Sequence, residues 1–298
     1  MFGKRPDGRL VKGMDPIVEM IPYFMPTRVD SQVFFGYDIK YENIVNYIVE
    51  KGNEGYRISF MEVIIAAFVR GISQNPEINR FIMNKKLYAR NELVISLVIL
   101  KEDNEETVAK VYFDPYDTIY DVCARIKKTI AENRKSESDN GTMKAVHSLM
   151  RVPGLPNFVI QLSRLADRFG LLPKSVIDII PFHTSMFFTN VASIGLDRVY
   201  HHIYNYGTTS IFISMGNIKK KLLMDKKGIA KKARVIPMGI TVDERVRGGA
   251  VYSNSFIAMK KYLEDPRLLE IPPEKVVFDK GCEYSCPKPD YDCIKIKE

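Results

Sequence analysis

Residues 235–256 read VIPMGITVDERVRGGAVYSNSF, and this stretch decides what kind of fold the chain adopts. Its apolar first half predicts a buried strand, and the residues after Gly248-Gly249 predict a long helix that stops at Asp265-Pro266. The charged run Asp243-Glu244-Arg245 lies at the junction. Strand-to-helix junctions are common places for reactive side chains, because the backbone is fixed there while the side chains face a cleft. The stretch therefore predicts an α/β protein with a candidate site at this turn.

The rest of the chain supplies further helices and strands. Residues 58–82 carry apolar side chains at three- and four-residue steps, which predicts a buried helix ending at Asn75-Pro76. Residues 118–135 predict a second, amphipathic helix, capped by either Asp117 or Thr118. Prolines divide residues 141–180 into helical pieces. The remaining patterns predict strands or strand-helix units at 31–52, 86–101, 106–115, 184–195, 208–216 and 218–224. Because these elements interleave without a regular βαβ order, we expect a mixed sheet rather than a doubly wound one.

Composition and charge narrow the class of protein. The 298 residues are 46% hydrophobic, enough for a large core, and no apolar run approaches the ~20 residues of a membrane span. No signal peptide opens the chain, so we expect a cytoplasmic protein and no membrane partner. The formal net charge of +8 favours anionic partners, and lysines concentrate in residues 219–234. That segment is either a hairpin with solvated basic edges or a patch that attracts phosphate.

Cysteines and histidines give no strong site. Cys282, Cys286 and Cys293 lack Cys-x-x-Cys spacing and have no neighbouring His, so no metal is expected. No Gly-rich phosphate loop, zinc-protease helix or Gly-x-Ser-x-Gly elbow occurs. We expect three parts: a loose N-terminal arm at 1–13, one domain at 14–270, and a mobile C-terminal tail at 271–298.

The order of segments across residues 14–270 resembles a known family. The buried helix ends in a turn with Pro76, Glu77 and Asn79, and residues 187–195, FFTNVASIG, follow later with a Thr before an Asn and a Gly. A basic hairpin, a strand, the Asp-Glu-Arg turn and a terminal helix then come in the same order. These features resemble the catalytic domains of 2-oxoacid dehydrogenase acyltransferases and the related chloramphenicol acetyltransferases.

The resemblance implies a fold, a reaction and an assembly. The fold is a chloramphenicol acetyltransferase-like two-layer α/β (α+β-like) sandwich of a mixed β-sheet with flanking helices. The reaction moves an acyl group between CoA and a small-molecule acceptor, at a site between the subunits of a homotrimer. Acyl-CoA would be a substrate, and its phosphates would contact Lys219, Lys220, Lys221 and Arg245. The hairpin lacks interleaved aromatics, so nucleic acid is not an expected partner.

The resemblance also assigns candidate catalytic residues. The family's turn carries Asp-His-Arg-x-x-Asp-Gly, whose His is the general base that deprotonates a thiol. Here Glu244 stands in the place of that His, and Gly248 in the place of the second Asp. Glu244 either acts as the base or pairs with a neighbouring arginine, Arg245 or Arg247.

Two further groups are candidates for this chemistry. Thr189 matches the hydroxyl that stabilises the oxyanion, although a Thr also suits a strand for its β-propensity. His202, or its neighbour His201, is a candidate for a relocated base. The alternative function is a catalytically inactive trimeric descendant that serves as a ligand-binding or assembly module.

Overall fold

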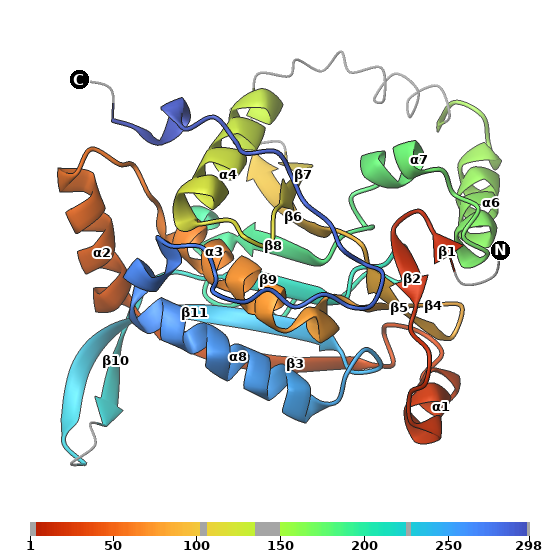
Figure 1. Cartoon of the computed structure of the whole chain (residues 1–298), viewed down its shortest axis with the longest axis horizontal. Helices are drawn as coiled ribbons and strands as arrows, with labels where there is room; N and C mark the ends of the chain where they lie inside the picture. Colours follow the sequence, from red (N-terminus) through yellow and green to blue (C-terminus); the bar gives the residue numbers. More distant parts are fainter. Residues whose placement is uncertain (1–3, 102–105, 135–149, 225–227, 297–298) are drawn as a thin grey trace.

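A mixed β-sheet forms the centre of the molecule (Figure 1). The computed structural model describes residues 4–101, 106–134, 150–224 and 228–296. Within these ranges seven strands follow the order β10-β11-β9-β8-β6-β7, with β3 paired to the free edge of β11. Strands β6, β8 and β9 run parallel, and the other neighbours run antiparallel. The strands are β3 (Gln32–Lys40), β6 (Leu93–Leu100), β7 (Glu106–Phe113), β8 (Met186–Asn190), β9 (Ile211–Met215), β10 (Lys219–Met224) and β11 (Ala230–Asp243).

Helices cover one face of this sheet and enclose the main core. They are α2 (Tyr41–Asn53), α3 (Phe60–Gln74), α4 (Ile119–Arg134) and α8 (Gly249–Glu264). Alternate strand residues such as Met238, Ile240 and Val242 point into this layer, as the two-residue period of a strand requires. The two-layer α/β sandwich with a mixed sheet that the sequence predicts is therefore confirmed.

Capping boxes fix the starts of two core helices. Ser59 accepts a hydrogen bond from the Glu62 amide at 3.4 Å, and the Glu62 carboxylate accepts from the Ser59 amide at 2.7 Å. Thr118 and Asp121 make the same exchange at the start of α4. Of the two predicted caps it is therefore Thr118 that caps α4, and Asp117 instead pairs with Arg125 at 2.8 Å.

Residues 197–206 cover part of the opposite face of the sheet. Phe187, Ile203 and Phe212 form a small cluster there. The chain at 197–200 crosses the sheet closely, because a Cβ on Gly239 would overlap the Val199 carbonyl. Ser214 donates to that carbonyl and accepts from the Val199 amide at 3.1 Å, which fixes the crossing.

Both ends of the described chain pack against the domain, although the sequence predicts a loose arm and a mobile tail. Strands β1 (Lys4–Arg5) and β2 (Gly8–Leu10) join β5 (Lys86–Arg90) and β4 (Phe81–Met83) in a second sheet of order β1-β2-β5-β4. In the tail, the Cys286 amide donates to Asp114 at 2.7 Å, and the Ile294 carbonyl accepts from the Arg57 amide at 2.8 Å. The partners are polar groups distant in sequence, so composition alone did not reveal the packing.

The remaining helices lie around this body. They are α1 (Pro16–Phe24), α6 (Leu155–Arg168) and α7 (Lys174–Ile179), with 3-10 turns at Pro76–Asn79, Val191–Ile194, Pro266–Leu269 and Asp292–Ile294. The predicted helical pieces of 141–180 correspond to α6 and α7, and residues 141–149 lie outside the described chain. None of the helices described is long and apolar enough to span a membrane.

Candidate functional site

A buried ion pair builds the turn after β11. The Asp243 carboxylate accepts from Arg245 Nε at 2.9 Å and Nη2 at 2.7 Å, and from Ser31 Oγ at 2.9 Å. The Tyr252 hydroxyl, on α8, donates to the Asp243 carbonyl at 3.1 Å. Two-point arginine–carboxylate bonds fix orientation as well as supply attraction. The turn is thus held rigidly between β3, β11 and α8.

The two arginines of the turn have partners other than Glu244. Arg245 is only 4% exposed, and its Nη1 donates to the Met25 carbonyl at 3.1 Å. Arg247 pairs with Glu77. The predicted alternative in which Glu244 pairs with one of these arginines is therefore wrong, because Asp243 and Glu77 take both guanidinium groups. The role of Arg245 in cofactor binding stays a prediction, and its visible contacts are structural.

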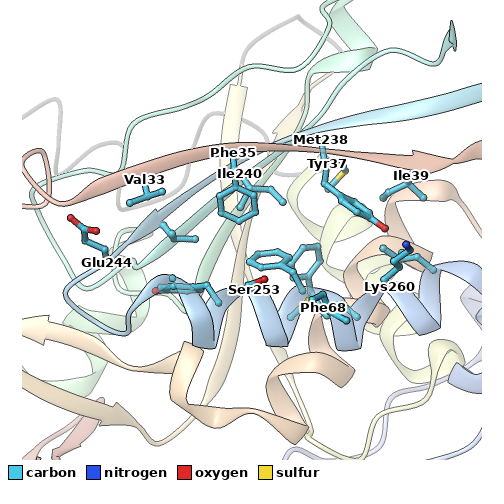
Figure 2. A pocket seen from close by; sticks show the side chains of 17 residues that line it. Val33, Phe35, Tyr37, Ile39, Phe68, Met238, Ile240, Glu244, Ser253 and Lys260 are labelled. Atoms are coloured by element: carbon cyan, nitrogen blue, oxygen red, sulfur yellow. The ribbon is translucent and has the colours of Figure 1, made fainter. Parts of the chain in front are cut away.

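Glu244 lies at the mouth of an apolar groove (Figure 2). Its amide donates to the Ser31 carbonyl at 3.0 Å, which fixes the backbone. Alternate residues of β11, among them Ile240 and Val242, point toward the helices. Glu244 is the next residue in this alternation, so its side chain points the same way. Among the residues that the structure describes, the half-buried Glu244 carboxylate has no ion-pair or hydrogen-bond partner.

The groove runs between β3, β11 and α8 and has a volume of about 600 Å³. Glu244 lies at one end, with Tyr37 and Lys260 at the other (Figure 2). The side chains between these ends are mostly aliphatic or aromatic. The sequence did not reveal this cavity, because it is formed by strands and a helix that are about two hundred positions apart in the chain.

Thr189 does not lie beside Glu244 within one chain. Its register partner is Ser214, which pairs with Gly239, and Glu244 follows Gly239 by five positions. That separation amounts to about 17 Å along the strand direction. Thr189 also points to the face of the sheet that carries Phe187, opposite the groove.

His202 lies on that same opposite face. It is exposed, whereas His201 stacks on Phe212 with ring centroids 4.0 Å apart. Burial lowers the pKa of His201. The residue after His202, Ile203, donates its amide to the Gln32 side chain at 3.2 Å, which holds this segment near the start of β3. Within one chain, the structure brings neither histidine into the groove of Glu244.

The three lysines lie on the hairpin of β10 and β11, which projects from the body (Figure 1). Lys219 pairs with Asp197 at 2.5 Å, and Lys221 pairs with Asp38. Lys220 points the other way and is exposed. Residues 225–227 lie outside the described chain.

Metal ligands do not converge in the described ranges, where no group of three or more His, Cys, Asp or Glu side chains is placed to hold an ion. The buried Cys282 thiol donates to the Ala89 carbonyl at 3.5 Å, and Cys293 is exposed.

Comparisons with known proteins support the resemblance. The model of the 2-oxoacid dehydrogenases acyltransferase (catalytic domain) family matches residues 183–271. A probable dihydrolipoamide acetyltransferase from Listeria monocytogenes 4b F2365 is similar in structure, with a TM-score of 0.55 at 14% identity over 90% of this chain and 98% of that one. Curated protein sequences gave no significant match.

Two further solved structures have the same fold. The cubic core of the pyruvate dehydrogenase multienzyme complex gives a TM-score of 0.56 at 10% identity, over 87% of this chain and 93% of that one. A chloramphenicol acetyltransferase gives a TM-score of 0.50 at 11% identity, over 86% of this chain and 99% of that one. The chain thus has the fold of these acyltransferases, and its segment 183–271 carries the sequence pattern of the 2-oxoacid dehydrogenase acyltransferase catalytic domain.

Proposed function

We propose that this chain transfers an acyl group between CoA and a small-molecule acceptor, at a site between the subunits of a homotrimer, with Glu244 as the general base. The observation that carries the proposal is the Glu244 carboxylate itself. It occupies the place of the family's histidine, lies on a rigid turn, faces the groove, and has no partner among the residues described. A carboxylate in such a position is able to accept a proton.

The reaction balances with this one base. Glu244 takes the proton of the acceptor's nucleophilic atom, which bonds to the acyl carbon. The carbon–sulfur bond of the CoA thioester then breaks, and the proton returns to the departing sulfur. Thr189 donates to the oxyanion between these steps, a contribution of a few kcal/mol in comparable sites.

Replacing a histidine by a carboxylate gives a weaker base but removes only part of the rate enhancement that the base supplies. The reference pKa values are about 4.3 for Glu and about 6.5 for His. With a Brønsted slope near one half, the weaker base loses only about tenfold in rate. A positioned base contributes about 10²–10⁴-fold, so a useful part of the effect is retained.

The separation of Thr189 from Glu244 supports a site between subunits. Two residues on opposite faces of one sheet act together only if they come from different chains. Two helices also leave apolar side chains uncovered: Ile17, Met20 and Phe24 on α1, and Phe158, Leu162 and Leu165 on α6. Exposed apolar surfaces of this kind are typical of contacts between proteins.

The hairpin supports CoA as the acyl donor. Lys220 is exposed on β10, and Lys219 and Lys221 lie on its other side in partly exposed ion pairs. Lysine ammonium groups bind phosphate as point charges. The proposal places the nucleotide end of CoA along this basic strand.

The second candidate is an inactive trimeric descendant that binds a ligand without turnover. Gly248, where the family has its second Asp, favours this candidate, since no side chain is present there to orient a base. The candidates differ in one measurable respect, which is whether the thioester bond is broken.

One experiment separates them. Acetyl-CoA binding is measured by calorimetry, and thioester loss is measured with thiol, amine and hydroxyl acceptors. In Glu244→Gln we expect turnover to fall by about ten- to a thousandfold while acetyl-CoA affinity stays within a few fold. His202→Ala serves as the matched control for a relocated base. Binding without turnover in the unmodified chain supports the second candidate, and loss of turnover only in His202→Ala would refute the role of Glu244.

A further inference from the structure

We propose that the groove beside Glu244 binds the aliphatic chain of the acyl group, so that this protein handles medium-length or longer acyl thioesters rather than acetyl groups alone. The position of the thioester bond at Glu244 rests on the proposed function. The affinity of the groove for an aliphatic chain rests on its lining.

The chemistry of the lining matches an aliphatic chain. Between its two ends the groove carries no charged side chain. Buried residues from three elements form its floor: Phe68 from α3, Ile240 from β11 and Met259 from α8. Phe35 and Phe256 meet edge to face at a centroid distance of 5.1 Å and form a partly buried wall. Sites lined in this way bind apolar groups through burial of surface.

The groove exists because α8 packs toward α3 rather than over the edge strand. Gly71 on α3 has no Cβ, and Met259 of α8 fills that space. Strand β3 pairs with β11 and with no second strand in the described chain. Val33 is therefore 39% exposed at the sheet edge although it faces the helix layer.

Shape and charge set the orientation of the chain. From Gly249 to Lys260 the α8 side of the groove extends for about 16 Å, the length of an extended acyl chain rather than an acetyl group. A free carboxylate beside Glu244 is repelled, whereas the carbonyl of a thioester is uncharged. The thioester therefore lies at Glu244, and the chain end points toward Tyr37 and Lys260.

The expected selectivity follows from buried surface. Each buried methylene strengthens binding by about fourfold. If all the added methylenes were fully buried, these fourfold factors would multiply. Because one side of the groove is open, we expect binding affinity to rise only on the order of a hundredfold from the acetyl to the decanoyl probe.

The test uses acyl-N-acetylcysteamine thioesters, which lack the CoA nucleotide, so that affinity reports on the groove alone. Calorimetry compares acetyl, octanoyl and decanoyl probes on the full chain. Ser253→Trp places a large ring in the middle of the groove from an exposed helix position. Asn254→Trp, at the next exposed position but outside the lining, is the matched control. Because the chain has no other Trp, indole fluorescence shows whether each ring is in an apolar or a wet environment.

We expect affinity to rise with chain length in the unmodified protein and in Asn254→Trp, and this dependence to disappear in Ser253→Trp. Equal affinity for acetyl and decanoyl probes would overturn the inference, even if acetyl-CoA turnover at Glu244 persists. Length-dependent binding without any turnover would support the groove and remove the proposed reaction. If Ser253→Trp leaves probe affinity unchanged and instead alters the oligomer mass in light scattering, the groove is a subunit contact and the inference fails.

Discussion

At the scale of single residues, the turn after β11 contains two adjacent carboxylates with opposite roles. Asp243 is fully buried and holds Arg245, whereas Glu244 has no partner in the described chain. We expect Asp243→Asn to lower the free energy of unfolding by about 3–5 kcal/mol, because it leaves a buried guanidinium without its counterion. Glu244→Gln is the matched control and should change it by less than about 0.5 kcal/mol. Urea denaturation measures both, and equal losses would contradict the division of roles.

Lys110 on β7 gives a prediction for pH. Burial lowers its pKa to about 8, and its ammonium donates to the Ile177 carbonyl at 2.6 Å. The unfolded chain has a pKa near 10.4 for Lys, so between about pH 8 and 10 the unfolded state binds more protons and stability rises with pH. Below pH 8 the charged group costs up to about 3 kcal/mol. We expect the stability difference between Lys110→Met and the unmodified chain to shrink from pH 7 to pH 10. The exposed Lys128→Met should show no such trend in the same denaturation series.

At the scale of elements, the crossing of 197–200 over the sheet depends on glycines that have no Cβ. Gly239→Ala places a Cβ against the Val199 carbonyl, which is backbone and yields little. We expect Gly239→Ala to lower the free energy of unfolding by about 1–3 kcal/mol, as measured by thermal or urea denaturation. Gly52→Ala in α2 meets nothing within 4 Å and should raise stability by up to about 1 kcal/mol, because alanine favours helix. A neutral Gly239→Ala would show that the crossing segment moves aside.

The elements predicted from sequence are those whose pattern is local. Helix α3 follows from its apolar period and the Asn75-Pro76 pair that ends it, and β11 follows from an apolar run ending in charge. The run 86–101 is two strands, β5 and β6, because the chain turns at Asn91-Glu92 to join two different sheets. Periodicity does not report which sheet a strand joins. Sequence likewise does not report which charged side chains meet. It left Glu244 as either a base or an ion-pair partner, and the contacts of Arg245 and Arg247 in the structure removed the second option.

At the scale of the whole molecule, long-range charge pairs hold the ends that composition predicts to be loose. Arg5 of β1 reaches Asp167 of α6 at 2.5 Å, and Asp167 also contacts His183 at 3.0 Å. At the other end Lys288 binds Asp121 at 3.1 Å. Neither partner is predictable from its own segment. The acyltransferase fold was still predictable as a whole, since the order of apolar segments persists at 10–14% identity to solved structures.

The site itself is predicted to exist only in the assembly, and a mixing experiment tests this directly. Glu244→Gln and Thr189→Val should each inactivate a uniform homotrimer, because every site then lacks its base or its oxyanion donor. If each site takes Glu244 from one chain and Thr189 from its neighbour, trimers refolded from an equal mixture contain intact sites. Random assembly makes about a quarter of the sites intact, so activity should return to about a quarter of the unmodified level. Mixing without refolding leaves subunits unexchanged and is the control. Within one chain the two residues lie about 17 Å apart along the strand direction, on opposite faces of the sheet. Failure to recover activity in confirmed mixed trimers would therefore show that Glu244 and Thr189 do not share a site between subunits.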